Sequence, residues 1–141
     1  MQVFIIGSPL ETAVALDKKR LNKQIIECQQ ILDALNGAKA WRNHPAVLQY
    51  RGHEKWLEMY MRTLHYYDRG IGLQLIANEE ALKLTPSFHV QEYFDQMKRR
   101  LYTKDPEHYK QWEHLGKSEV NYYWSEVENK FIKYKNGKRI E

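Results

Sequence analysis

One apolar stripe in the stretch "LDKKRLNKQIIECQQIL", residues 16–32, constrains the fold more than any other feature of the chain. Apolar side chains recur at alternating intervals of four and three residues, at Leu21, Ile25, Cys28, Leu32 and, just beyond the stretch, Leu35. Because an α-helix turns once in about 3.6 residues, this spacing predicts a long helix with one face toward a core. The helix should begin after Asp17 and end at about Leu35, before the Asn-Gly pair at 36–37.

Further helix starts are predicted where a capping residue precedes a proline, at Ser8-Pro9, His44-Pro45 and Asp105-Pro106. Amphipathic spacing predicts one helix that continues past Gly52 to about Gly70, a short helix around 79–84, and another over 90–101. The opening "MQVFII" is expected to be a short strand or an extended arm, and the Asn-Gly pair at 136–137 predicts a hairpin near the C-terminus. The expected fold class is mainly α, a compact single-domain bundle of about four to six helices with a short C-terminal hairpin.

Composition narrows the class of protein without naming it. A chain of 141 residues fits one domain, and 22 Lys and Arg against 18 Asp and Glu leave a net charge of +4, which permits a polyanionic partner without requiring one. The single cysteine, Cys28, excludes an internal disulfide, and its place on the apolar stripe indicates a core residue rather than a nucleophile. No apolar run approaches the roughly 20 residues of a membrane span. A cytoplasmic protein without a membrane partner is therefore expected.

A lone carboxylate lies beside the apolar stripe, with cationic residues on the same side of the helix. Arg20 and Glu27 are seven residues apart, almost two full turns, and Lys23 lies between them. Such a group is either an ordinary ion pair on a solvated helix face or a partly buried carboxylate held ionised for proton transfer. The spacing alone leaves both interpretations open.

Three segments, in their order along the chain, resemble the pyrimidine-dimer DNA glycosylase family, the phage endonuclease V type, and especially its uncharacterised phage and bacterial members. The segments are "LDKKRLNKQIIECQQIL", "WRNHPAVLQYRGHEKWL" and "KRRLYTKDPEHY". Residues from about Lys117 onward find no counterpart in the family. The chain is accordingly expected to comprise a helical domain at 1–116 and a C-terminal extension at 117–141 that packs on the same domain.

The resemblance implies a DNA glycosylase with an associated abasic-site lyase activity on damaged or modified pyrimidines in duplex DNA. Family members attack C1′ of the damaged nucleotide with their N-terminal α-amine, form an imine and cleave the strand by β-elimination, assisted by a glutamate on the first long helix. Met1 would supply the amine, Glu27 the carboxylate, and His53 would assist. The residues expected to bind DNA are Arg20, Lys23, Gln24, Arg100, Lys104, Lys110 and Trp112. Neither a cofactor nor a metal is expected, and the protein should act as a monomer.

Two positions differ from the studied members of the family. Gln2 stands where those members carry a small residue that becomes the first one after removal of the initiator methionine, and Ile26 stands where they carry an arginine. A bulky second residue normally leaves Met1 in place, so the free amine would belong to Met1. Lys23, one turn from Glu27, remains an alternative amine.

Two other functions and several other residues stay open. The chain could be a non-catalytic nucleic-acid-binding module that kept the fold, or a phage-type inhibitor that binds another protein through its Tyr- and Trp-rich surface. The histidines show no zinc-binding spacing, and His44 is expected to cap a helix or pack. Aromatic clusters are more often core than stacking platforms, which applies here to Tyr122, Tyr123 and Trp124. The basic run at 135–139 is either a solvated tail or, on a DNA-binding enzyme, a source of salt-dependent affinity.

Overall fold

The computed structural model of the chain describes residues 1–71, 79 and 83–140. The helices in these parts are α1 (Pro9–Ala15), α2 (Lys18–Leu35), α3 (Pro45–Gln49), α4 (Glu54–Asp68), α6 (Gln91–Lys104) and the 3₁₀ helix η1 (Lys110–Leu115). The strands are β1 (Asn121–Ser125), β2 (Lys130–Lys135) and β3 (Lys138–Ile140). Residues 80–82, half of the short helix expected around 79–84, lie outside the described residues.

The first two helices begin where the sequence predicts, after Ser8 and after Asp17. The Ser8 side chain accepts from the Glu11 amide and the Glu11 carboxylate accepts from the Ser8 amide, which confirms the capping box of α1. Helix α2 follows Asp17 and ends at Leu35, as the apolar stripe predicts. The carboxylate of Asp17 does not cap the helix, however. It accepts a hydrogen bond from the hydroxyl of Tyr109, which connects α2 to the segment before η1. It also forms an ion pair with Arg20 at 3.2 Å.

His44 and Gly52 define the two short connections around α3. His44 is the N-cap of α3, and its Nδ1 accepts from the Ala46 amide at 3.0 Å, so the expected capping role is confirmed. Gly52 has a φ of +89°, and no atom lies within 4 Å of the place where a Cβ would stand. The helix that was expected to continue past Gly52 is therefore interrupted there by a bend, which separates α3 from α4.

The prediction that an α-helix starts at Asp105 is wrong. Asp105 is the C-cap of α6, and its carboxylate accepts from the His108 amide at 3.1 Å within a single turn. The chain then enters the 3₁₀ helix η1, where Trp112 is buried and stacks on Tyr109. A cap followed by proline serves an isolated turn as well as a helix, so this pattern could not distinguish them.

The C-terminal residues form a three-stranded antiparallel sheet in the order β1-β2-β3. The β2–β3 hairpin is confirmed, and both turn residues, Asn136 and Gly137, have positive φ as a tight Asn-Gly turn requires. Strand β1 lies outside the expected hairpin, in a segment for which the sequence left helix and strand both open. It pairs with β2 and packs on α3 and α6. The fold is thus mainly α with a small sheet.

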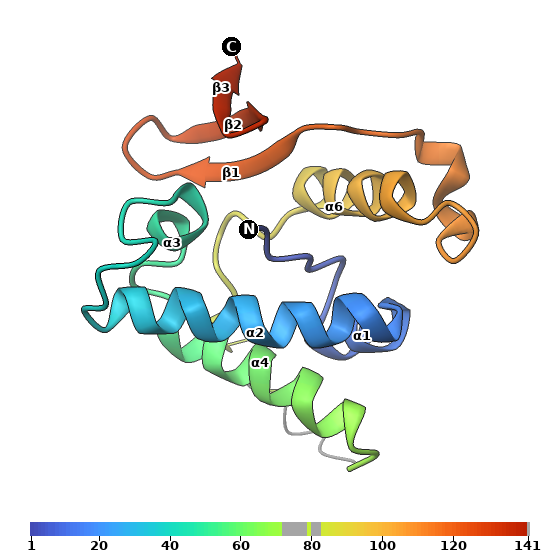
Figure 1. Cartoon of the computed structure of the whole chain (residues 1–141), viewed down its shortest axis with the longest axis horizontal. Helices are drawn as coiled ribbons and strands as arrows, with labels where there is room; N and C mark the ends of the chain where they lie inside the picture. The colour runs from blue at the N-terminus through green and yellow to red at the C-terminus, as the bar shows by residue number, and fades with distance from the viewer. Residues whose placement is uncertain (72–78, 80–82, 141) are drawn as a thin grey trace.

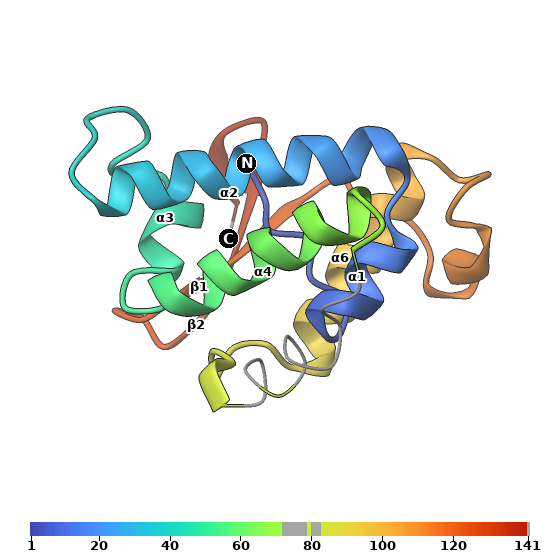
Figure 2. The ribbon, with the colours of Figure 1, turned by 90° about the horizontal axis from the view of Figure 1, so that it is seen from below.

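The opening residues run through the middle of the fold (Figure 1). Helix α2 packs on α4, and α1 also packs on α4. On the opposite side of the N-terminal segment lie α6 and β1 (Figure 1), and the view from below places the N-terminus beside the middle of α2 again (Figure 2). Val3 and Ile5 are fully buried, so the arm is part of the core. No helix in the described parts of the chain is long and apolar enough to cross a membrane.

Candidate active site

The N-terminal arm is held by side chains rather than by a neighbouring strand. Gln24 on α2 accepts from the Phe4 amide with its oxygen and donates to the Gln2 carbonyl at 3.0 Å with its nitrogen. Tyr93 on α6 donates to the Val3 carbonyl at 2.8 Å. These partners come from helices on both sides, so they hold the arm between α2 and α6. Burial of its backbone polar groups is thereby compensated.

The sheet holds the first two residues of the arm. The side-chain amide of Gln2 donates to the Tyr122 carbonyl at 2.8 Å and accepts from the Tyr122 amide at 2.9 Å. The Tyr123 hydroxyl donates to the Met1 carbonyl at 2.7 Å. The side-chain amide of Gln2 thus pairs with β1 as a further strand would. A small second residue could not form these two hydrogen bonds.

This anchoring brings the amine of Met1 to 3.8 Å from Oε2 of Glu27. The Met1 side chain is 3% exposed and that of Glu27 is 12% exposed. Glu27 lies near the middle of α2, on the side that packs against the rest of the molecule. Of the two interpretations of this carboxylate, the structure supports the partly buried one.

Burial and nearby cations lower the pKa of the Met1 amine below its ordinary value of 8.0. Burial is the largest cause; Lys23, Lys104 and Arg100 act in the same direction, and the negative charge of Glu27 opposes them. An α-amine already has the lowest pKa among the common amines of a protein, so a further fall increases the neutral, nucleophilic fraction near neutral pH.

Lys104 extends this positive environment to the surface. Its pKa is lowered by burial of its stem and by Arg100, Lys23 and Arg20. The residues expected to bind DNA that are exposed in the structure are Lys23, Lys104 and Lys110. Lys23 and Lys104 both act on the amine, so they lie on the side of the molecule where the site is located.

Four other residues expected to bind DNA make internal contacts instead. Arg100 donates to the Ser118 carbonyl and to Oδ1 of Asn121, each at 3.1 Å, and so supports the connection to β1. Gln24 is 1% exposed and holds the arm. Arg20 pairs with Asp17 and Trp112 is 8% exposed. Direct DNA contacts by these four residues stay predictions, and their present partners do not favour them.

The two histidines that flank α3, His44 and His53, have different surroundings. The positive amine contributes, after burial, to lowering the pKa of His44. His53 stands at the N-cap position of α4 without a side-chain cap, and its ring meets Phe88 edge-on at 5.9 Å between centroids. Among the described residues no recorded contact joins His53 to Glu27 or Met1. Its expected role as an assistant therefore stays a prediction.

Tyr123 completes the surroundings of the amine and was missed as a site residue. Its ring meets that of His44 edge-on at 5.7 Å, and burial together with the charge of Glu27 raises the pKa of its hydroxyl. Sequence periodicity could not find Tyr123 or His44, because it relates neighbours along one element and these residues meet only through the tertiary fold. Cys28 is fully buried, as expected of a core residue, and burial raises the pKa of its thiol.

A buried primary amine beside one carboxylate can perform nucleophilic catalysis with proton transfer. In the described residues no group of three His, Cys, Asp or Glu side chains is arranged to hold a metal ion.

Comparison with known proteins places the chain in a family. The model of one family, described as pyrimidine dimer DNA glycosylase, matches residues 1–71. That range contains both the amine and Glu27 and ends before the sheet. No curated protein and no solved structure matches the chain. Since the match covers half of its 141 residues, the chain belongs to the pyrimidine dimer DNA glycosylase family.

Proposed function

We propose that this protein is a DNA glycosylase with an associated abasic-site lyase activity, acting as a monomer on damaged or modified pyrimidines in duplex DNA. The observation that carries the proposal is the 3.8 Å separation of the Met1 amine from Glu27 in a largely buried site. Family membership supplies the DNA substrate and the glycosylase class. The amine and the carboxylate supply a chemistry that such a reaction needs.

Each step of the proposed glycosylase and lyase reaction uses groups that the protein and the DNA supply. The neutral amine bonds to C1′, and the bond from C1′ to the base nitrogen breaks, so the base leaves with the electron pair and takes up a proton. The nitrogen then loses a proton, and its electron pair forms the C1′–N double bond as the C1′–O4′ bond breaks; O4′ takes up the proton, and the product is an iminium. The Glu27 carboxylate then removes a proton from C2′, and the C3′–O bond breaks with departure of the phosphate.

DNA would approach from the side on which Lys23 and Lys104 lie. Both side chains are exposed, and both lower the pKa of the amine. Cations at this position would therefore hold phosphates and keep the nucleophile neutral at the same time. Reaching C1′ requires the duplex to bend or a base to leave the stack.

Borohydride reduction tests the imine directly. The full-length protein would be mixed with duplexes carrying a pyrimidine dimer, an abasic site or a modified pyrimidine, and borohydride would convert any imine into a stable protein–DNA link. We expect trapping on at least one duplex, with strand cleavage reduced about 10²- to 10⁴-fold in Glu27→Gln while binding persists. Glu58→Gln, the same substitution at an exposed site on α4, serves as the matched control. Binding without trapping on any duplex would leave the non-catalytic module as the function.

The identity of the nucleophile is tested by sequencing the trapped peptide. We expect the DNA on the peptide that begins with Met1, in Lys23→Ala as in the wild type. DNA on a peptide that contains Lys23 would instead support the alternative amine. Lys55→Ala, at an exposed position on α4, controls for loss of a surface cation.

A further inference from the structure

The cap of α3 determines which nitrogen of His44 carries the proton. Nδ1 of His44 accepts from the Ala46 amide at 3.0 Å, so the proton of the neutral imidazole is on Nε2. Protonation of the ring would place a second proton on Nδ1, where the Ala46 amide already donates. The cap therefore favours a neutral ring that can donate a hydrogen bond through Nε2.

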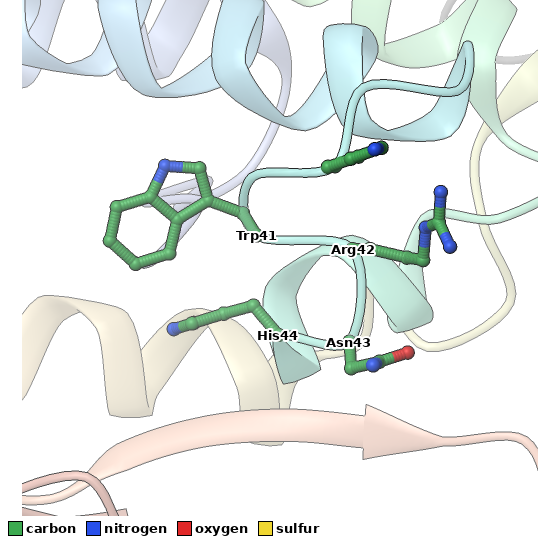
Figure 3. Close-up of a pocket in the computed structure, with 5 residues that line it drawn as sticks. Trp41, Arg42, Asn43 and His44 are labelled. Atoms are coloured by element: carbon green, nitrogen blue, oxygen red, sulfur yellow. The ribbon is translucent and has the colours of Figure 1, made fainter.

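Two aromatic side chains hold the His44 ring in place. The Trp41 indole meets it edge-on at 5.8 Å between centroids, and the Tyr123 ring meets it edge-on at 5.7 Å. Trp41 has a φ of +64°, which a bulky residue adopts only at a cost, so this contact is kept against backbone strain. Figure 3 shows the His44 ring extending away from α3, with one nitrogen at its far end. His44 is only partly buried, and among the described residues no partner is recorded for its Nε2.

Tyr123 connects His44 with the amine. Its hydroxyl donates to the Met1 carbonyl at 2.7 Å while its ring contacts His44. The positive amine is also one cause, after burial, of the lowered pKa of His44, so the two groups lie close enough to interact. Both causes favour the neutral imidazole near neutral pH. A nucleotide bonded to the amine at C1′ would therefore lie beside an uncharged hydrogen-bond donor.

We propose that the Nε2–H of His44 donates a hydrogen bond to O2 of the damaged pyrimidine as the base leaves C1′. The inference rests on the proposed function, because it assigns a further catalytic residue to that reaction. When the amine displaces the base, the electron pair of the C1′–N1 bond passes to the pyrimidine, and its charge is shared between N1 and O2. An oriented donor stabilises this charge without a proton transfer, and the base then takes up its proton from water.

O2 is the acceptor of the base that is best placed for this contact. It is separated from C1′ only by N1 and C2, whereas O4 of thymine lies on the far side of the ring. Thymine, cytosine and their forms damaged at C5 and C6 all carry O2, so the contact would serve damaged pyrimidines as a class. An abasic site has no base to release, so His44 would take no part in the reaction there.

Single-turnover kinetics on two kinds of duplex test this step. Duplexes with a cyclobutane thymine dimer or with 5-hydroxymethyluracil report cleavage of the glycosidic bond, which is measured after treatment with hot alkali. A duplex with an abasic site reports the lyase step alone, which is measured as direct strand cleavage. A hydrogen bond to the base affects only the first reaction, whereas a displaced amine affects both.

Two substitutions separate the donor of His44 from its cap. His44→Asn keeps an acceptor for the Ala46 amide but has no group at the place of Nε2. We expect a Tm close to that of the wild type, glycosidic cleavage slowed about 10- to 10²-fold, and unchanged strand cleavage on the abasic duplex. His44→Gln places an amide nitrogen near the position of Nε2, so it should recover part of the lost rate although it caps α3 less well. His65→Asn, at an exposed position on α4, is the matched control.

Equal glycosidic cleavage by the wild type and His44→Asn would overturn the inference. Equal slowing on both kinds of duplex would also overturn it, because that result is expected if His44 only positions the amine through Tyr123. A wild type that cleaves the abasic duplex alone would do the same, since no base is then released. The proposed function fails in a different way, when the wild type forms no borohydride-trapped complex on any duplex.

Discussion

Gln2 and Tyr122 are joined by two hydrogen bonds, of 2.8 and 2.9 Å, that pair a side-chain amide with the backbone of β1. The residues are 120 positions apart in the sequence, so the bonds connect the N-terminal arm with the C-terminal sheet. They matter for chemistry because the amine lies one residue before Gln2. Gln2 differs from the small second residue of the studied family members, and this anchoring gives a physical reason for the difference.

Replacing Gln2 should loosen both the fold and the amine. Gln2→Leu keeps a bulky second residue, and with it Met1, but leaves the Tyr122 amide and carbonyl buried without partners. We expect a loss of about 2–4 kcal/mol of stability in urea unfolding, because each unsatisfied group costs about 1–3 kcal/mol. The borohydride trapping rate should fall as well. Gln29→Ala, at an exposed position on α2, should change neither quantity, and a normal trapping rate in Gln2→Leu would contradict the positioning role.

Tyr123→Phe removes one hydroxyl and leaves the ring against His44. The hydroxyl donates to the Met1 carbonyl, so its loss should cost about 1 kcal/mol of stability and allow the amine to move. We expect slower trapping on an abasic duplex with little change in DNA affinity. Tyr134→Phe is the matched control, since this β2 tyrosine meets the Tyr123 ring but has no recorded bond to the arm. A weaker affinity with a normal trapping rate would instead point to a DNA contact by Tyr123.

Local signals in the sequence were enough to predict the helices near the site. The stripe from Leu21 to Leu35 and the capping box at Ser8 specify short-range geometry, and both are confirmed. They could not specify that Gln24, on the buried side of α2, turns inward to hold the arm. A polar residue beside an apolar stripe can be exposed or buried, and only the partners supplied by other elements decide between them.

The pairing of strand β1 and the contacts of its tyrosines could not be predicted from the sequence, for a related reason. The Asn-Gly turn at 136–137 marks the β2–β3 hairpin by itself, whereas "NYYWS" carries no alternation of apolar and polar residues. Its aromatic residues were expected to be core rather than stacking residues, and Tyr122 and Tyr123 are indeed buried. Their backbone and hydroxyl contacts with Met1 and Gln2 depend on long-range packing, about which periodicity carries no information.

Imine formation on an abasic duplex should reach its plateau at a lower pH than an ordinary α-amine allows. Burial and nearby cations lower the pKa of the Met1 amine below 8.0, so the neutral fraction rises with pH through that lowered value. Between the folded pKa and 8.0 the unfolded chain binds more protons, so stability should also rise with pH across this window. The trapping rate as a function of pH measures the midpoint, and urea unfolding measures the stability.

The direction of the shift is tested by removing one cation. Lys23→Ala takes away a charge that lowers the pKa of the amine, so the midpoint of the trapping profile should move to higher pH. Lys55→Ala should leave it in place. A wild-type midpoint at or above pH 8, or no movement in Lys23→Ala, would contradict the assignment of the profile to the Met1 amine.

Arg100 and Lys104 lie one turn apart on α6, yet the loss of Arg100 should reduce stability and the loss of Lys104 should reduce the salt dependence of DNA binding. Arg100 is half buried and bonded to the Ser118 carbonyl and Asn121, so Arg100→Ala should cost about 1–3 kcal/mol in urea unfolding. Lys104 is exposed and repelled by neighbouring cations, so Lys104→Ala should keep stability within about 0.5 kcal/mol and reduce the salt slope of DNA binding by about 1. If Arg100→Ala is instead as stable as the wild type and loses salt slope, Arg100 is released from the connection to β1 when DNA binds. Its phosphate contact would then follow the pattern that the family resemblance implies.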